Sequence, residues 1–226
     1  MEATSIKEIR HLWGVKIAKK LLPRKFCVVS DDCWGGQVYR QHGLPYNTPT
    51  VGLYVHPMDY INFFTNLHKS DACDMTFIQV EGSHFPIAQT PYAKLFFVHY
   101  NSEQAAKDAF LRRYKRIDWD NLFIKIDFGK KEYTQEHIDQ WNKLKISRSL
   151  ALYPLGKTEA PIWNSVRIRR WLLDGAEQFD NTRRYVNIFK NLQDGTIECK
   201  FDYRLLNFLI LDPAAWRWLR KTFIAS

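Results

Sequence analysis

Residues 30–36, Ser-Asp-Asp-Cys-Trp-Gly-Gly, combine two carboxylates, a thiol and two glycines in one short polar segment. Asp31 and Asp32 are candidates for a general base or for binding hydroxyl groups of a donor, and Cys33 is a candidate nucleophile. The two glycines allow a backbone to approach a ligand closely. The alternative is a capped turn with a buried thiol and a buried tryptophan, and the residue types leave both interpretations open.

His99 and Tyr100 follow an apolar run that is typical of a buried strand. If that strand belongs to a parallel sheet, its end lies at the edge where open α/β sheets bind ligands. His99 is therefore a candidate general base for an acceptor hydroxyl. A single hydrogen-bonded histidine with a structural role is the alternative.

Two further segments carry candidate ligands for a donor. Arg112, Arg113 and Arg116 end a predicted helix, where they suit a phosphate or carboxylate clamp or simply complement the helix dipole. Residues 44–50 form a proline-stiffened loop with three hydroxyl groups, which fits a sugar or phosphate site or an ordinary connector. Several common motifs are absent: there is no P-loop, dinucleotide fingerprint, serine-hydrolase elbow or metal-ligand spacing. We expect no metal and no cofactor.

The order of elements predicts how these side chains are positioned. Apolar runs at 26–30, 51–55, 75–80, 94–99, 122–126 and 146–152 predict strands. Helices are predicted over 5–22, from Pro57 to residue 67, from the cap Ser102 to Arg116, and from the cap Thr134 to residue 144. This alternation predicts a three-layer α/β/α domain with a mainly parallel sheet. We expect a basic amphipathic N-terminal helix (1–24), an α/β core (25–155) and a mixed or helical C-terminal extension packed on the core (156–226).

Composition limits the class of protein. The chain has 226 residues, 46% of them apolar, and carries 33 Lys and Arg against 24 Asp and Glu. The chain is long enough to bury one hydrophobic core. Its four cysteines show neither a disulfide pattern nor a metal-ligand spacing, and free thiols suit a reducing cytoplasm. Neither a secretory signal nor a spanning segment is visible. Aromatic and basic residues near both termini suit an anionic membrane surface at the inner face of the cell membrane, or docking on the core. Dispersed basic residues without a motif argue against nucleic acid.

Three blocks of this sequence resemble the bacterial domain of unknown function 1919 family. They are 26–39 (FCVVSDDCWGGQVY), 43–53 (GLPYNTPTVGL), and His99-Tyr100 with 112–121 (RRYKRIDWDN). The resemblance covers roughly 25–150, and the N-terminal helix and the stretch beyond about 155 lie outside it. Members often appear among capsule, exopolysaccharide or O-antigen biosynthesis proteins. The family commonly has Asn-Asn where this chain has Asp31-Asp32, which favours Cys33 and His99 as the shared candidates for chemistry.

The resemblance and the residues together predict a transferase of surface-polysaccharide biosynthesis, cytoplasmic or peripheral at the membrane. It would move a glycosyl or acyl group from a phosphate-bearing donor, a nucleotide sugar or an acyl-CoA, to a glycan or lipid-linked glycan. The alternative is a non-catalytic glycan- or nucleotide-binding subunit. The candidate catalytic residues are His99, Cys33 and Asp32. The candidate substrate- or donor-binding residues are Ser30, Asp31, Trp34, Gly35, Gly36, Tyr39, Tyr46, Thr48, Thr50, Tyr100, Arg112, Arg113, Arg116, Asp120 and Asn121.

Overall fold

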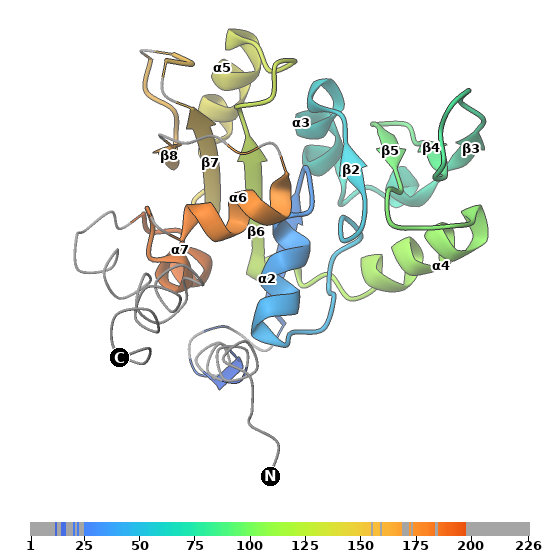
Figure 1. The fold of residues 1–226 in the computed structure, drawn as a ribbon, viewed down its shortest axis with the longest axis horizontal. Coiled ribbons are helices and arrows are strands. Elements are labelled where there is room, and N and C mark those ends of the chain that lie inside the picture. Colours follow the sequence, from blue (N-terminus) through green and yellow to red (C-terminus); the bar gives the residue numbers. More distant parts are fainter. Residues whose placement is uncertain are drawn as a thin grey trace, which may run out of the picture.

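The computed structural model contains two separate four-stranded sheets with helices around them (Figure 1). It describes residues 25–197 except 155, 159, 169–171, 173 and 184, together with positions 12, 15, 16, 20 and 22. Most of the helix predicted over 5–22 and all of 203–226 lie outside the described residues. In the part of the chain that the structure describes, no helix has the length and apolar character needed to cross a membrane.

The first sheet is parallel throughout and has the order β1-β6-β7-β8. Its strands are β1 (Cys27–Ser30), β6 (Leu122–Asp127), β7 (Ser149–Pro154) and β8 (Ser165–Ile168). Cys27 pairs with Leu122 and Ser30 with Lys125, so β1 and β6 run in register to the same carboxyl edge. The edge strand β8 comes after residue 155, so residues beyond that position complete the parallel sheet.

Helices cover both faces of the parallel sheet, because alternate side chains of its strands enter two different cores. Val28, Phe123 and Leu150 pack with helices α2 (Trp34–His42) and α6 (Gly175–Thr182). Val29, Ile124 and Ala151 pack with α3 (Pro57–Asn66) and α5 (Gln135–Leu144). Figure 1 shows α6 crossing in front of β6 and β7, with α2 next to it. The predicted three-layer arrangement is therefore confirmed for this sheet.

The second sheet is antiparallel, and it corrects the prediction of one mainly parallel sheet. Its order is β2-β5-β4-β3, with strands β2 (Tyr54–Val55), β5 (Lys94–Phe96), β4 (Ile87–Gln89) and β3 (Thr76–Ile78). Three of the predicted strands belong to it, and β4 was not predicted. Helix α4 (Glu103–Tyr114) packs on it through Phe110, whose ring lies against Phe97. The whole sheet is inserted between β1 and β6, whose pairing spans most of the first half of the chain.

Three helices begin where the sequence predicts, and a fourth does not. Thr134 is the N-cap residue of α5, as expected. Ser102 accepts a hydrogen bond from the Ala105 N–H and begins α4, and Pro57 is the first residue of α3. The segment 31–36, predicted to be a loop, instead turns into α2 at Trp34, with Cys33 as its N-cap residue. The helix continues to His42 and ends at Gly43, which has a left-handed φ of 61°. The short helix α7 (Ile188–Asp194) packs against β7.

Candidate functional site

The site begins where β1 meets α2, at the carboxyl edge of the parallel sheet. The turn is held by Ser30, whose hydroxyl donates to the Asp32 carbonyl (2.7 Å) and accepts from the Gly35 N–H (3.0 Å). The Asp32 carboxylate accepts from the Trp34 N–H at 3.0 Å. Two of the free N–H groups at the start of α2 are thereby satisfied, and Cys33 is left half-buried at the helix amino end.

The two glycines of this turn have different roles, which a matched pair of substitutions separates. A Cβ on Gly35 would lie 2.6 Å from the Ser30 Oγ, which its two hydrogen bonds fix in place. Gly35→Ala is expected to lower the free energy of unfolding by about 1–3 kcal/mol through overpacking. A Cβ on Gly36 would meet only Val51 at 3.7 Å, so Gly36→Ala is expected to be neutral or stabilising. Urea unfolding measures both, and an equal cost would contradict this difference.

A cluster of buried charges lies beside Cys33, between β1 and β6. The Lys125 ammonium lies 3.0 Å from an Asp31 oxygen, 2.8 Å from an Asp32 oxygen and 3.6 Å from an Asp127 oxygen. Lys130, in the loop after β6, contacts Asp31 and lies 3.2 Å from Asp32. The side chains of Lys125 and Asp31 are fully buried, and that of Lys130 is 12% exposed. Both lysine charges are therefore balanced inside the protein.

The electrostatics of this cluster assign different protonation states to its carboxylates. Burial opposes the ionisation of Asp32, but Lys125 and Lys130 outweigh it and hold the pKa of Asp32 well below its usual range. Burial raises the pKa of Asp127 to about 7, since Asp31 and Asp32 already occupy the lysines. Burial lowers the pKa of Lys125, yet the surrounding carboxylates more than reverse that effect. Asp32 is thus ionised, but its low pKa and its ion pairs with the lysines make it a weak base, contrary to the role expected of it.

Cys33 and His99 form a pair. The Cys33 Sγ lies 3.3 Å from the His99 Nε2, although 66 residues separate them in the chain. The His99 side chain is exposed, so it is accessible to a substrate. Burial, and then the charges of Asp32 and Asp174, raise the pKa of the Cys33 thiol. The thiol therefore keeps its proton at neutral pH, and its use as a nucleophile requires a base at the position of His99.

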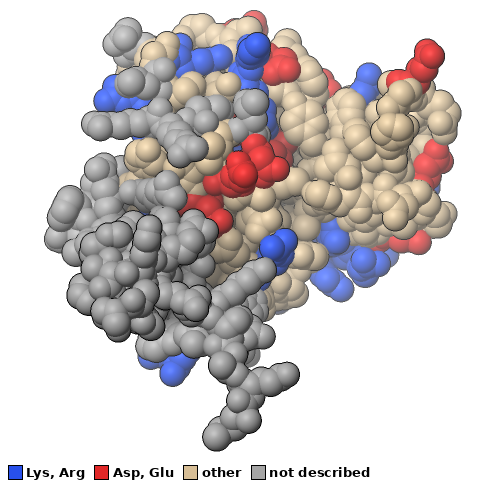
Figure 2. Space-filling view, in the orientation of Figure 1, with Lys and Arg blue, Asp and Glu red and all other residues tan. Residues whose placement is uncertain are grey.

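The environment of Cys33 is acidic on the side of α6. Gly175 approaches so closely that a Cβ there would lie 2.7 Å from the Asp32 carboxyl and 3.0 Å from the Cys33 nitrogen. Asp174 caps this helix by accepting from the Ala176 and Glu177 N–H groups, and both Asp174 and Glu177 are exposed. Figure 2 shows acidic side chains gathered near the middle of the face that carries α6.

Several candidate binding residues are instead part of the core. Trp34 is fully buried against Phe123 and Phe179. The Tyr39 hydroxyl accepts from the Val28 N–H, and Thr48 donates to the Val28 carbonyl at 2.6 Å. Thr50 accepts from the Ser30 N–H at 3.4 Å. The hydroxyl groups of Tyr39, Thr48 and Thr50 thus connect β1 to α2 and to the 44–50 loop.

The residues of the third sequence block, His99-Tyr100 with 112–121, lie in two separate parts of the structure. The segment 118–121 precedes β6, and the Asp118 N–H donates to the Cys27 Sγ at the start of β1. Asp120 and Asn121 therefore lie at the amino edge of the sheet, opposite Cys33. Arg116 donates to the Tyr46 carbonyl and Arg112 is exposed. Arg113 is bonded to the backbone of residue 51 and to Tyr100, so the three arginines do not form a clamp beside Cys33.

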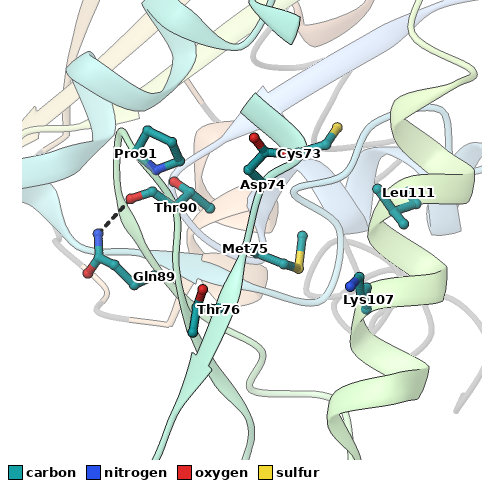
Figure 3. Close-up of a pocket in the computed structure, with 9 residues that line it drawn as sticks. All are labelled: Cys73, Asp74, Met75, Thr76, Gln89, Thr90, Pro91, Lys107 and Leu111. Atoms are coloured by element: carbon teal, nitrogen blue, oxygen red, sulfur yellow. Dashed lines mark hydrogen bonds between the residues drawn. The ribbon is translucent and has the colours of Figure 1, made fainter. Parts of the chain in front are cut away.

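A separate hollow of about 690 Å³ lies on the antiparallel sheet, between β3, β4 and α4 (Figure 3). It is lined by Cys73, Asp74, Met75, Thr76, Gln89, Thr90, Pro91, Lys107 and Leu111. Burial raises the pKa of the Cys73 thiol to about 11, so this thiol is less reactive than an ordinary cysteine. The described residues hold no group of side chains with the arrangement of a metal site.

Sequence reasoning missed four members of the buried cluster: Lys125, Asp127, Lys130 and Tyr133, whose hydroxyl donates to Asp31 at 3.4 Å. Lys125 and Asp127 did leave a signal, because a charged residue inside a strand buried on both faces needs a partner. Lys130 and Tyr133 left none, since they come from a charged loop where such residues are ordinary.

Comparison with known proteins places the chain in a family. The sequence model described as "Domain of unknown function (DUF1919)" matches residues 5–172, a wider span than the 25–150 expected. A protein of Haemophilus influenzae, described as an uncharacterized protein, is 32% identical over 118 residues. The aligned segment makes up 52% of this chain and 57% of that relative, so the chain spans little more than half of its length. The chain belongs to the family of domain of unknown function 1919.

Proposed function

We propose that this protein is an acyltransferase that carries the acyl group as a thioester on Cys33. The observation that supports this proposal is the 3.3 Å contact between the Cys33 Sγ and the His99 Nε2. A thiol at the amino end of a helix, with an imidazole beside it, is the arrangement that activates a sulfur nucleophile. The positive end of the α2 dipole favours the thiolate that forms during attack.

The reaction has two balanced steps. In the first, His99 takes the proton from Cys33 while Sγ bonds to the carbonyl carbon of a thioester donor. The donor's carbon–sulfur bond then breaks, and its thiolate leaves with the proton from His99. In the second step, His99 takes the proton of an acceptor hydroxyl while its oxygen bonds to the carbonyl carbon of the Cys33 thioester. The bond between that carbon and Sγ then breaks, and the Cys33 thiolate leaves with the proton from His99.

Glycosyl transfer is less well supported than acyl transfer. It would need groups that hold a diphosphate beside the base, and the arginines expected to do so lie elsewhere or are bonded to the protein itself. The cations nearest to Cys33 are balanced by buried carboxylates. A glycan or lipid-linked glycan acceptor, and a location at the inner face of the cell membrane, remain proposals that rest on the sequence resemblance.

The test is intact-mass spectrometry after incubation with acetyl-CoA, and with a small acetyl thioester that lacks phosphate. The full chain is expected to gain one acetyl group on Cys33, and Cys33→Ser is expected to gain none. Cys73→Ser is the matched control, since it removes another half-buried thiol, which lines the separate hollow on the antiparallel sheet. His99→Ala is expected to slow acylation by about 100-fold or more.

The absence of an adduct with both donors would contradict the acyltransferase proposal. It would favour the non-catalytic binding subunit, particularly if replacement of both Cys33 and His99 left glycan output in cells unchanged. An adduct with acetyl-CoA but not with the small thioester would support a phosphate-bearing donor.

A further inference from the structure

One turn joins the two halves of the Cys33–His99 pair. Residues 50–52 lie between the end of β1 and the turn that carries His99. On one side the Ser30 N–H donates to the Thr50 Oγ1 at 3.4 Å. On the other the His99 N–H donates to the Gly52 carbonyl at 3.3 Å. The distance between the thiol and the imidazole therefore depends on how this turn is held.

Arg113 of α4 holds the turn from outside. Its Nη1 donates both to the Val51 carbonyl and to the Tyr100 hydroxyl, at 2.5 Å each. The Tyr100 hydroxyl also donates to the Val51 carbonyl at 3.3 Å. The guanidinium lies 5.0 Å from the ring centre of Tyr46 and 5.9 Å from that of Tyr100. Arg113 thus binds the 50–52 turn and the residue next to His99 at the same time.

Tyr100 reaches this position only because residue 52 is a glycine. Gly52 has a φ of +82°, and a Cβ there would lie 3.1 Å from the Tyr100 ring. The Tyr100 ring lies close to this backbone and meets the Phe97 ring edge-on, with 5.6 Å between the ring centres. The turn that carries His99 is therefore fixed through Tyr100. The Tyr100 ring packs against Gly52 and Phe97, and its hydroxyl accepts a charged hydrogen bond from Arg113.

We propose that Arg113, acting through Tyr100 and the 50–52 turn, is a positioning residue that sets His99 opposite Cys33. The inference rests on the proposed function, because it gives Arg113 a purpose in the use of that pair. It replaces the donor-binding role expected for Arg113 from the sequence. Lysine cannot substitute fully, since a single ammonium does not stack on two rings as a planar guanidinium does.

The test measures the rate of alkylation of Cys33 by iodoacetamide as a function of pH, in the full chain, with the Cys33 peptide quantified by mass spectrometry. His99→Ala is expected to slow alkylation at pH 7 by roughly tenfold, equivalent to about one pKa unit of the thiol. Arg113→Met and Tyr100→Phe are expected to shift the profile in the same direction, and Arg113→Lys to restore it only in part. Lys115→Met is the control, because Lys115 is exposed at the same end of α4.

The outcomes separate this inference from the proposed function. Wild-type profiles for Arg113→Met and Tyr100→Phe, beside a changed His99→Ala, would overturn the positioning role and leave the acyltransferase intact. A changed profile in all three, without any thioester on the wild-type chain, would support positioning and contradict acyl transfer. An unchanged His99→Ala profile would overturn both. Tyr100→Phe removes a single hydroxyl group, so it keeps the test valid if Arg113→Met does not fold.

Discussion

Replacing Lys125 by methionine is expected to lower the free energy of unfolding by about 3–5 kcal/mol, a large share of the stability of a domain. The side chain of Lys125 is fully buried and its ammonium contacts Asp31, Asp32 and Asp127. Methionine has a similar length and fills most of the same volume. The loss therefore comes from the carboxylates, which would share Lys130 as their one remaining cation in the cluster.

The pH dependence of this loss distinguishes lost charge compensation from lost packing. Without Lys125 the carboxylates take up protons more readily, so the cost of Lys125→Met is expected to be smaller near pH 5 than near pH 8. Chemical unfolding at both pH values measures it. Lys143→Met, at an exposed position of α5, is the control and is expected to change stability by less than about 0.5 kcal/mol. A cost that is equal at both pH values would show that packing, and not charge, gives Lys125 its importance.

Three strands of the parallel sheet, β1, β6 and β7, could be predicted from local signals, whereas its edge strand β8 and the antiparallel arrangement of the second sheet could not. Strands such as β1 and β6 are apolar throughout because helices cover both of their faces. β4, with three residues, is too short to show a period. β2 and β5 lie in apolar runs like those of the parallel strands, but their pairing is antiparallel. The direction of a strand depends on contacts distant in sequence, which periodicity does not report.

The sequence singled out Cys33 and His99, which the structure brings together, but it missed the buried charges beside them. Cys33 and His99 could be singled out because each follows an apolar run. Their contact did not arise by the expected route, since β5 belongs to the antiparallel sheet and His99 reaches Cys33 through the 50–52 turn. Asp32 appeared catalytic from its type, yet two lysines hold it as an ion pair. Those lysines lie more than 90 residues along the chain, so no spacing argument connects them.

The buried cluster and the Cys33–His99 pair are physically linked through Asp32. One oxygen of its carboxylate binds Lys125, and the other accepts from the first N–H of α2. The same negative charge helps to raise the pKa of the Cys33 thiol. The lysines therefore fix the turn that carries Cys33, while the charge of Asp32 adds to burial in keeping the Cys33 thiol protonated. A stable turn and a protected thiol follow from one arrangement of charges.

The stability of the protein is expected to fall as the pH rises from about 5 to about 7, and Asp127→Asn is expected to remove this fall. Burial raises the pKa of Asp127 to about 7, from an ordinary value of 3.8. Over that window the folded state holds a proton that the unfolded state has released, so each added pH unit favours unfolding by up to about 1.4 kcal/mol. Asp32, whose pKa is held low, is ionised in both states above pH 5 and adds nothing to this slope.

The measurement is urea unfolding of both proteins at half-unit steps of pH. Asparagine has the shape of a protonated aspartate and keeps an oxygen for the Gly129 N–H, which bonds to Asp127 at 3.0 Å. At pH 8, where wild-type Asp127 is ionised inside the protein, the variant is therefore expected to be the more stable of the two, by up to roughly 4 kcal/mol. Parallel curves for the two proteins would show instead that Asp127 is ionised throughout, with Lys125 shared equally among three carboxylates. The charge left over in the cluster would then lie beside Cys33 and make its thiol harder to ionise.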